Sequence, residues 1–157
     1  LKRLSTLGVG PLIFAGIISP SVFVWIFGAE WARAGELVRF MTPWFILQFM
    51  ASPLSLVFTV IGRQKLGSKL QASGLLVRTG SVAVAALLFP EYIVEVFALS
   101  GAVFYGYYLV AVFQVVQSPR LSVLKALVGN FWVTIIWLIL GVVALLCMPF
   151  IEGLLIV

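Results

Sequence analysis

The feature that most constrains this chain is a run of residues, 7–27, that contains no charged side chain. Because an α-helix rises 1.5 Å per residue, about 20 apolar residues cross the roughly 30 Å hydrocarbon core of a bilayer. Over the whole chain 63% of the residues are hydrophobic and only 10% are charged, whereas about a quarter of the residues of a soluble domain are charged. The sequence therefore predicts an integral membrane protein.

Four more apolar runs follow the first one. They extend over about residues 37–61, 74–89, 92–116 and 128–150, and the run at 74–89 is short unless it also takes in residues 70–73. A helix satisfies its own backbone hydrogen bonds, as hydrocarbon requires. We therefore expect an all-α fold, a polytopic membrane helix bundle of about five transmembrane helices, with residues 1–157 forming a single transmembrane domain.

The Lys and Arg residues around the predicted helices indicate the orientation in the membrane, because positive side chains near helix ends are retained on the cytoplasmic side. Arg33 and Arg39 lie toward one side. Seven residues lie toward the other side, at the N-terminal flank and in the loops after the second and fourth helices: Lys2, Arg3, Arg63, Lys65, Lys69, Arg120 and Lys125. We expect a multi-pass protein with a cytoplasmic N-terminus and an outward C-terminus.

The residue types that most enzymes use are scarce. The chain has no His and no Asp, and its five acidic residues are Glu30, Glu36, Glu91, Glu95 and Glu152. This excludes a Ser/His/Asp triad, a His-based metal site and an Asp-rich magnesium motif. We expect no enzyme activity, no cofactor and no metal. The net charge of +5 fits basic loops at anionic lipid headgroups better than a nucleic-acid partner.

A polar stripe runs along the second predicted helix. This polar stripe consists of Gln48, Ser52, Ser55 and Thr59. At 100° per residue, the last three side chains lie within about 40° of Gln48 around the helix axis. The polar stripe fits two interpretations equally: a wall of a hydrated cavity that binds substrate, or interhelical packing through small and hydroxylated residues.

Two prolines, Pro43 and Pro53, fall within the same predicted helix. Each removes a backbone donor and crowds the preceding turn. The sequence predicts a helix that is interrupted at both positions.

Three charged residues lie within the predicted helices. Arg39 and Arg78 either extend to the headgroups or face a cavity, where a guanidinium suits an anionic substrate group such as a pyrophosphate. Arg78 is expected four or five residues inside the cytoplasmic boundary. Glu95 either reaches the outer interface or binds a coupling ion. We expect Arg78 and Glu95 to lie at different depths.

Short motifs follow one another from the first predicted helix into the loop after the second. They are Phe27-Gly-Ala-Glu-Trp31, Ala34-Gly35, Pro43-Trp44, Gln48-Phe49, Ser52-Pro53-Leu54-Ser55 and Gly62-Arg63-Gln64-Lys65. In this order and spacing they resemble the second half of bacterial lipopolysaccharide and polysaccharide flippases, in the multidrug/oligosaccharidyl-lipid/polysaccharide exporter superfamily. The resemblance covers about forty contiguous residues, and beyond them it extends only to the helix topology.

The resemblance implies a two-lobed flippase, with this chain forming part of the C-terminal lobe. That family moves an undecaprenyl-pyrophosphate-linked oligosaccharide across the bacterial inner membrane by alternating access, for export of O-antigen, capsule or exopolysaccharide. The implied partners are the lipid-linked oligosaccharide, membrane lipids, the N-terminal lobe and the polysaccharide polymerase machinery. A start at Leu1 and an apolar end also lead us to expect a fragment of a longer chain.

Three other classes stay open. A cation-coupled multidrug exporter predicts an acidic cavity residue, for which Glu95 is the candidate. A non-transporting membrane subunit predicts that the polar stripe is packed and dry. A membrane-embedded enzyme requires acidic residues that converge near the membrane surface.

Overall fold

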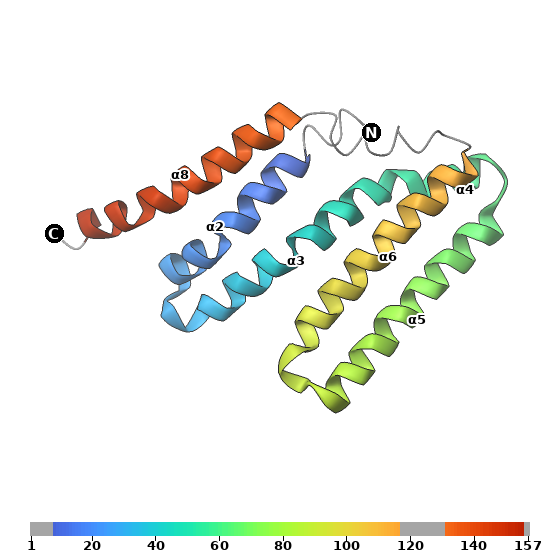
Figure 1. Cartoon of the computed structure of the whole chain (residues 1–157), viewed down its shortest axis with the longest axis horizontal. Coiled ribbons are helices and arrows are strands. Elements are labelled where there is room, and N and C mark those ends of the chain that lie inside the picture. Colours follow the sequence, from blue (N-terminus) through green and yellow to red (C-terminus); the bar gives the residue numbers. More distant parts are fainter. Residues whose placement is uncertain (1–7, 117–130, 156–157) are drawn as a thin grey trace. The chain divides into compact units, whose positions relative to one another are not determined.

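The computed structural model describes residues 8–116 and 131–155, and within these ranges the chain is helical and contains no strand (Figure 1). This confirms the all-α fold. The helices are α2 (Gly10–Phe27), α3 (Ala32–Ala51), α4 (Ser55–Val60), α5 (Gln64–Leu88), α6 (Ile93–Val115) and α8 (Phe131–Leu155). Short 3-10 turns lie at η2 (Ala29–Trp31), η3 (Ser52–Leu54) and η4 (Pro90–Tyr92).

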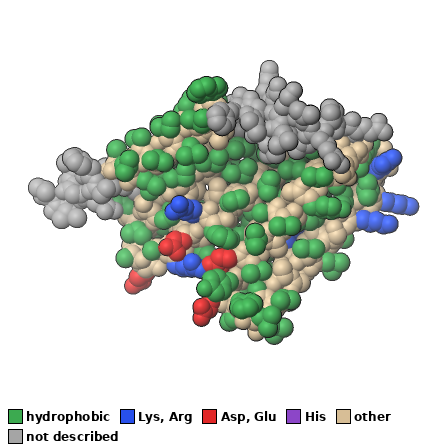
Figure 2. Space-filling model, in the orientation of Figure 1, with side chains coloured by type: hydrophobic (Ala, Val, Ile, Leu, Met, Phe, Trp, Pro, Cys, Tyr) green, Lys and Arg blue, Asp and Glu red, His purple; other side chains and the backbone are tan. Residues whose placement is uncertain are grey.

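Helices of this chain are long and apolar enough to cross a membrane. Among the described residues, four stretches meet this condition: Gly10–Phe27, Ala29–Val60, Gln64–Leu88 and Pro90–Val115. A shorter apolar segment, Trp132–Cys147, lies in α8. Large apolar side chains remain exposed, as Val60 (83%) and Leu87 (84%) illustrate, and Figure 2 shows such side chains over much of the visible face. Lipid would cover them, so the chain is a multi-pass membrane protein.

The observed helices differ from the predicted ones most at α5. It begins at Gln64 rather than near residue 74, because Lys and Gln are good helix formers and the polar residues 64–71 therefore continue the helix. The second predicted span, 37–61, consists of α3, η3 and α4 and begins earlier, at Ala32. Residues 117–130, which include the predicted start of the last span, lie outside the described residues.

The effects of the two prolines differ. Pro53 lies in η3, where the α-helix is interrupted between α3 and α4, as predicted. Pro43 lies inside α3, which continues through it. The expectation of an interruption at Pro43 is therefore wrong. Helix α3 is thus a single α-helix of 20 residues that contains Pro43.

The chain divides into two compact units. One consists of Leu1–Thr42 and Val128–Val157, and the other of Pro43–Leu127. The division falls within α3. A single domain over residues 1–157 stays a prediction.

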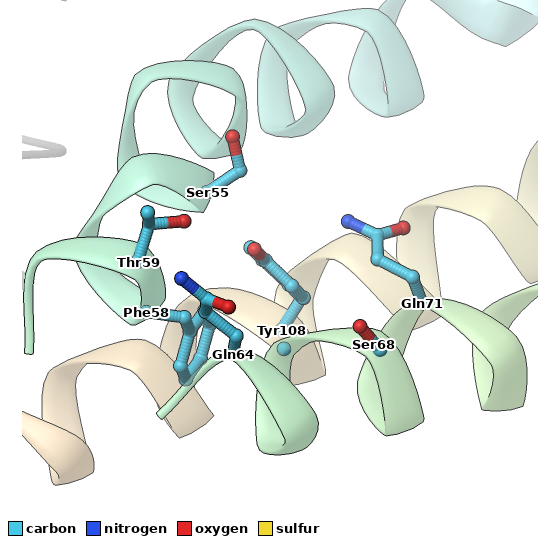
Figure 3. A pocket seen from close by; sticks show the side chains of 8 residues that line it. Ser55, Phe58, Thr59, Gln64, Ser68, Gln71 and Tyr108 are labelled. Carbon is cyan, nitrogen blue, oxygen red and sulfur yellow. The ribbon is translucent and has the colours of Figure 1, made fainter. Parts of the chain in front are cut away.

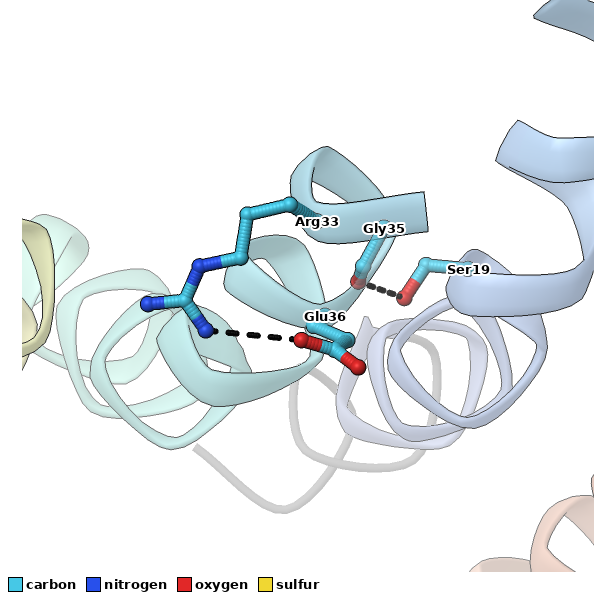
Figure 4. Close-up of polar contacts among 4 residues, drawn as sticks. All are labelled: Ser19, Arg33, Gly35 and Glu36. Atoms are coloured by element: carbon cyan, nitrogen blue, oxygen red, sulfur yellow. Dashed lines mark hydrogen bonds and ion pairs between the residues drawn. The ribbon is translucent and has the colours of Figure 1, made fainter. Parts of the chain in front are cut away.

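In the first unit, α2 and α8 run side by side in the same direction (Figure 1). The rings of Phe14 and Trp137 meet at 5.7 Å between centroids. The first and fifth of five consecutive crossings must run in the same direction, and α2 and α8 satisfy this condition. At the contact between α2 and α3, the buried Ser19 hydroxyl lies 3.0 Å from the Gly35 carbonyl oxygen (Figure 4), which satisfies a polar group inside the unit.

In the second unit, α5 and α6 lie side by side and are joined by η4 (Figure 1). The Phe104 ring of α6 packs directly on Gly74 of α5, where any added Cβ would overlap the ring. Trp44 packs on Gly101 in the same way and meets Phe97 edge-on at 4.8 Å. Aromatic rings seated on glycines thus hold these helices close together.

The short helix α4 is held by one aromatic anchor. Phe58 is only 2% exposed, and its Cβ lies 3.1 Å from the position that a Cβ on Gly67 would take. After α4 the chain turns at Gly62, whose φ is +71°, a value that suits glycine. The Arg63 amide donates to the Phe58 carbonyl at 2.8 Å, which is the cap typical of a helix that ends at a left-handed glycine.

This packing predicts a disulfide between α4 and α5. In a Cys147→Ala background, the double variant Phe58→Cys, Gly67→Cys should form an intramolecular disulfide under mild oxidation, because bridged Cβ atoms lie about 3.5–4.5 Å apart and only a small shift is needed. A mobility shift on non-reducing gels and mass spectrometry measure it.

The matched control is the pair Leu56→Cys, Gly67→Cys, since Leu56 lies on the same short helix but is 67% exposed. Equal cross-linking in both pairs, or none in the first, would contradict the packing of α4.

Candidate functional site

A polar groove lies in the second unit, between α4, α5 and α6 (Figure 3). Its larger part has a volume of about 550 Å³ and is lined by Ser55, Phe58, Thr59, Gln64, Gly67, Ser68, Gln71 and Tyr108. A smaller part of about 190 Å³ is lined by Gln48, Ala51, Ser52, Ser55, Gln71, Tyr105 and Tyr108. The two parts share Ser55, Gln71 and Tyr108, so we treat them as one polar groove.

The predicted polar stripe forms the first wall of this groove. Gln48 and Ser52 line the smaller part, Thr59 lines the larger part, and Ser55 lines both. All four are exposed rather than packed among the described residues. The Ser55 hydroxyl donates to the Ser52 carbonyl at 2.8 Å, across the junction of η3 and α4. The stripe is therefore not packed against other helices among the described residues, and its role as the wall of a hydrated cavity stays a prediction.

The second wall was missed by the sequence analysis. Gln64, Ser68 and Gln71 come from the first turns of α5, whereas the sequence predicts the third helix over about residues 74–89, with 70–73 as an extension. Their spacing of four and three residues places them on one helix face, and this spacing is the signal that could have revealed them. In Figure 3 the amides of Gln64 and Gln71 lie on either side of Tyr108.

Tyr108 of α6 lies at the base of the groove. It is 1% exposed, its ring lies 6.0 Å from that of Phe58, and the Gln71 amide is a hydrogen-bond partner of its hydroxyl. Most of the residues that line the two parts of the groove carry a hydroxyl or amide group, and none of them carries a charge. The groove therefore offers neutral donors and acceptors.

Arg78 lies beyond one end of the groove, at the middle of α5. It comes fourteen residues after Gln64 and ten before Leu88, which is about 21 Å and 15 Å along the helix. Arg78 therefore lies at mid-helix in α5, which begins earlier than predicted, and its depth relative to the cytoplasmic boundary stays a prediction. On the helix face, Arg78 falls within about 40° of Gln64, so it lies on the same face of α5 as the second wall of the groove.

Contacts with α6 and with its own helix hold the Arg78 side chain. Its Nε donates to the Gly74 carbonyl at 3.2 Å. Its guanidinium carbon lies 5.5 Å from the Phe104 ring centroid and 5.7 Å from that of Tyr105, within cation–π range. Among the described residues, no carboxylate lies within ion-pair distance of Arg78. Since Tyr105 also lines the groove, a cation adjoins the neutral groove at mid-helix.

The other two charged candidates do not line the groove. Arg39 is exposed on the part of α3 that belongs to the first unit. Glu95 is half-buried in the first turn of α6, nine residues before Phe104, which Arg78 contacts. Glu95 and the ring that Arg78 contacts therefore lie at different levels along α6, as expected. The predicted roles of Arg39 in substrate binding and of Glu95 in ion coupling stay predictions.

The groove lies beside a basic end of the second unit. Arg63, Lys65 and Lys69 are exposed around the junction of α4 and α5, where Figure 2 shows Lys and Arg side chains gathered. Glu91 lies in η4, at the opposite end of α5. The other predicted basic residues, Lys2, Arg3, Arg120 and Lys125, lie outside the described residues.

Comparisons with protein-family models, with curated proteins and with solved structures found no match to this chain.

If the polar groove is hydrated, cysteines placed in it should react with a membrane-impermeant thiol reagent. In a Cys147→Ala background, the single variants Ser55→Cys, Thr59→Cys and Ser68→Cys should label several-fold faster than Leu76→Cys, because thiols react as thiolates and hydrocarbon excludes both the ion and the charged reagent. Labelling rates in native membranes measure this.

Leu76 is the matched control because it is an exposed apolar residue of the same helix, α5. Labelling of the three groove positions at the slow rate of Leu76→Cys would contradict a hydrated groove.

Proposed function

We propose that this chain forms part of a membrane translocator that carries an undecaprenyl-pyrophosphate-linked oligosaccharide across the bacterial inner membrane by alternating access. The observation that carries the proposal is a guanidinium at mid-helix, without a carboxylate partner among the described residues, at the end of a neutral polar groove. The translocator breaks no covalent bond and is therefore not an enzyme.

The energetic cost of Arg78 supports an anionic ligand. An arginine at the centre of a membrane helix costs about 2.5–3.5 kcal/mol on insertion scales, and such residues usually serve function. Contact with two aromatic rings offsets part of this cost. Since Nε is bound to Gly74, the two terminal nitrogens are the donors suited to a phosphate, which guanidinium groups bind in bidentate fashion.

The groove supports a substrate with a hydroxylated part. Its hydroxyl and amide side chains can replace water around sugar hydroxyls while the sugar passes through the membrane. The stretch 27–65, which resembles the flippase family, includes the polar stripe and ends at the start of α5. The motif series therefore includes the first wall of the groove and Gln64 of the second wall.

The basic end of the second unit supports the proposed orientation. By the positive-inside rule, Arg63, Lys65 and Lys69 belong on the cytoplasmic side. The part of the groove lined by Gln64 then lies nearer the cytoplasm, and Arg78 lies deeper in the bilayer. A substrate would load from the inner leaflet with its sugars toward the basic end.

The alternative functions have less support. A multidrug exporter needs an acidic residue in its cavity, and Glu95 is not among the residues that line the groove. A non-transporting subunit predicts a packed stripe, whereas all four stripe residues are exposed. We therefore rank both below the glycolipid translocator.

Expression of the gene that encodes this chain in a flippase-null bacterium tests the proposal. Surface glycan should be restored, and the lipid-linked precursor should stop accumulating in the cytoplasmic leaflet. Arg78→Ala should reduce surface glycan by about tenfold or more, because a charge-assisted hydrogen bond contributes about 1.5–3 kcal/mol. Arg78→Lys should retain only part of the activity, because Lys keeps the positive charge but lacks the paired N–H donors of the guanidinium.

Thr79→Val is the matched control, since Thr79 is exposed and its hydroxyl bonds to the Leu75 carbonyl of its own helix. Absence of surface glycan despite normal protein levels in the membrane, or wild-type transport by Arg78→Ala, would contradict the proposal.

A further inference from the structure

We propose that the larger part of the polar groove is a subsite for uncharged sugar residues, separate from the position of the phosphate beside Arg78. This inference rests on the proposed function and deepens it, because it divides the substrate between two parts of one groove. The subsite is formed by Ser55 and Thr59 of α4, Gln64, Ser68 and Gln71 of α5, and Tyr108 of α6.

The lining chemistry points to a neutral, hydroxyl-rich ligand. Hydroxyl and carboxamide groups each both donate and accept hydrogen bonds, which matches the dual character of sugar hydroxyls. The residues that line this part of the groove carry no charge. Its volume of about 550 Å³ lies within the range of about 300–1,000 Å³ that small-molecule sites occupy.

Two other ligand classes fit this part of the groove less well. An anion would require a cation in the lining, whereas Arg78 lies beyond the smaller part and the basic residues around the α4–α5 junction are not among the lining residues. An apolar drug would require accessible aromatic surface. The two rings in the lining, Phe58 and Tyr108, are almost completely buried, so they offer no open aromatic face to such a ligand.

The spacing along α5 fixes the order of the two parts. Gln71 and Arg78 are two turns apart on one face, so their Cα atoms are separated by about 10.5 Å along the axis. A phosphate held by Arg78 would therefore place the first sugar beside Gln71 and Tyr105. The following sugar would reach Thr59, Gln64 and Ser68.

Gln71 is the residue on which this subsite depends most. It lines both parts of the groove, and its amide is a hydrogen-bond partner of the Tyr108 hydroxyl. Replacement by Leu removes these polar groups at nearly constant volume. The neighbouring Ser73 does not line the groove, and its hydroxyl donates to the Leu70 carbonyl at 2.7 Å.

The test is protection of a groove cysteine by free sugars. Purified full-length protein in lipid nanodiscs would carry Cys147→Ala and Thr59→Cys, and the rate of modification by a charged thiol reagent would be measured. Maltotriose or chitotriose at millimolar concentration should slow modification several-fold, while inorganic pyrophosphate should not. Added Gln71→Leu should abolish the protection, whereas added Ser73→Ala should leave it intact.

Absence of protection by both trisaccharides, or protection that persists with Gln71→Leu, would overturn the subsite. An unchanged rate without sugar shows that Gln71→Leu has left the groove folded. If the wild-type protein restores surface glycan but the Thr59→Cys protein is not protected by the sugars, the subsite is wrong and the proposed function stands. If protection is seen without restored glycan, the proposed function is wrong and the subsite stands.

Discussion

A guanidinium halfway along a membrane-crossing helix is the constraint on which the rest of the second unit depends. Hydrocarbon provides no hydrogen bonds, so the protein itself must hold Arg78. Gly74 contributes in two ways. Its carbonyl accepts a hydrogen bond from Arg78 Nε, and because it has no side chain the Phe104 ring can pack directly on its backbone. The same ring then lies under the guanidinium. One glycine thus sets both the spacing of α5 and α6 and the position of the cation.

The groove arises from the interruption of one transmembrane segment. Because α3 ends just before Pro53 and α4 ends just before Gly62, the polar stripe extends over the end of α3, the η3 turn and the short helix α4. Phe58 anchors α4 against Gly67, so that Ser55 and Thr59 face the polar side of α5. The groove therefore depends on buried aromatic side chains that do not themselves contact the proposed substrate.

Much of the fold follows from the sequence, because runs without charge of about 20 residues have few alternatives to a transmembrane helix. The stripe from Gln48 to Thr59 was also predictable, since helical periodicity alone puts its members on one face. The start of α5 was not predictable in this way, because Lys65, Lys69 and Gln71 are equally compatible with a loop. The contacts of Tyr105 and Tyr108 depend on how α5 and α6 are aligned along each other. The residue pattern of one helix does not determine this alignment.

The most direct test of the central claim is transport by purified protein in liposomes. A fluorescent undecaprenyl-pyrophosphate-linked oligosaccharide would be placed in both leaflets, and its loss from the inner leaflet would be followed by quenching from outside. The account predicts rapid translocation by the wild-type protein and a rate near that of protein-free liposomes for Arg78→Ala. Equal rates for the two proteins would contradict a phosphate contact at Arg78, and no translocation by the wild-type protein would contradict the translocator itself.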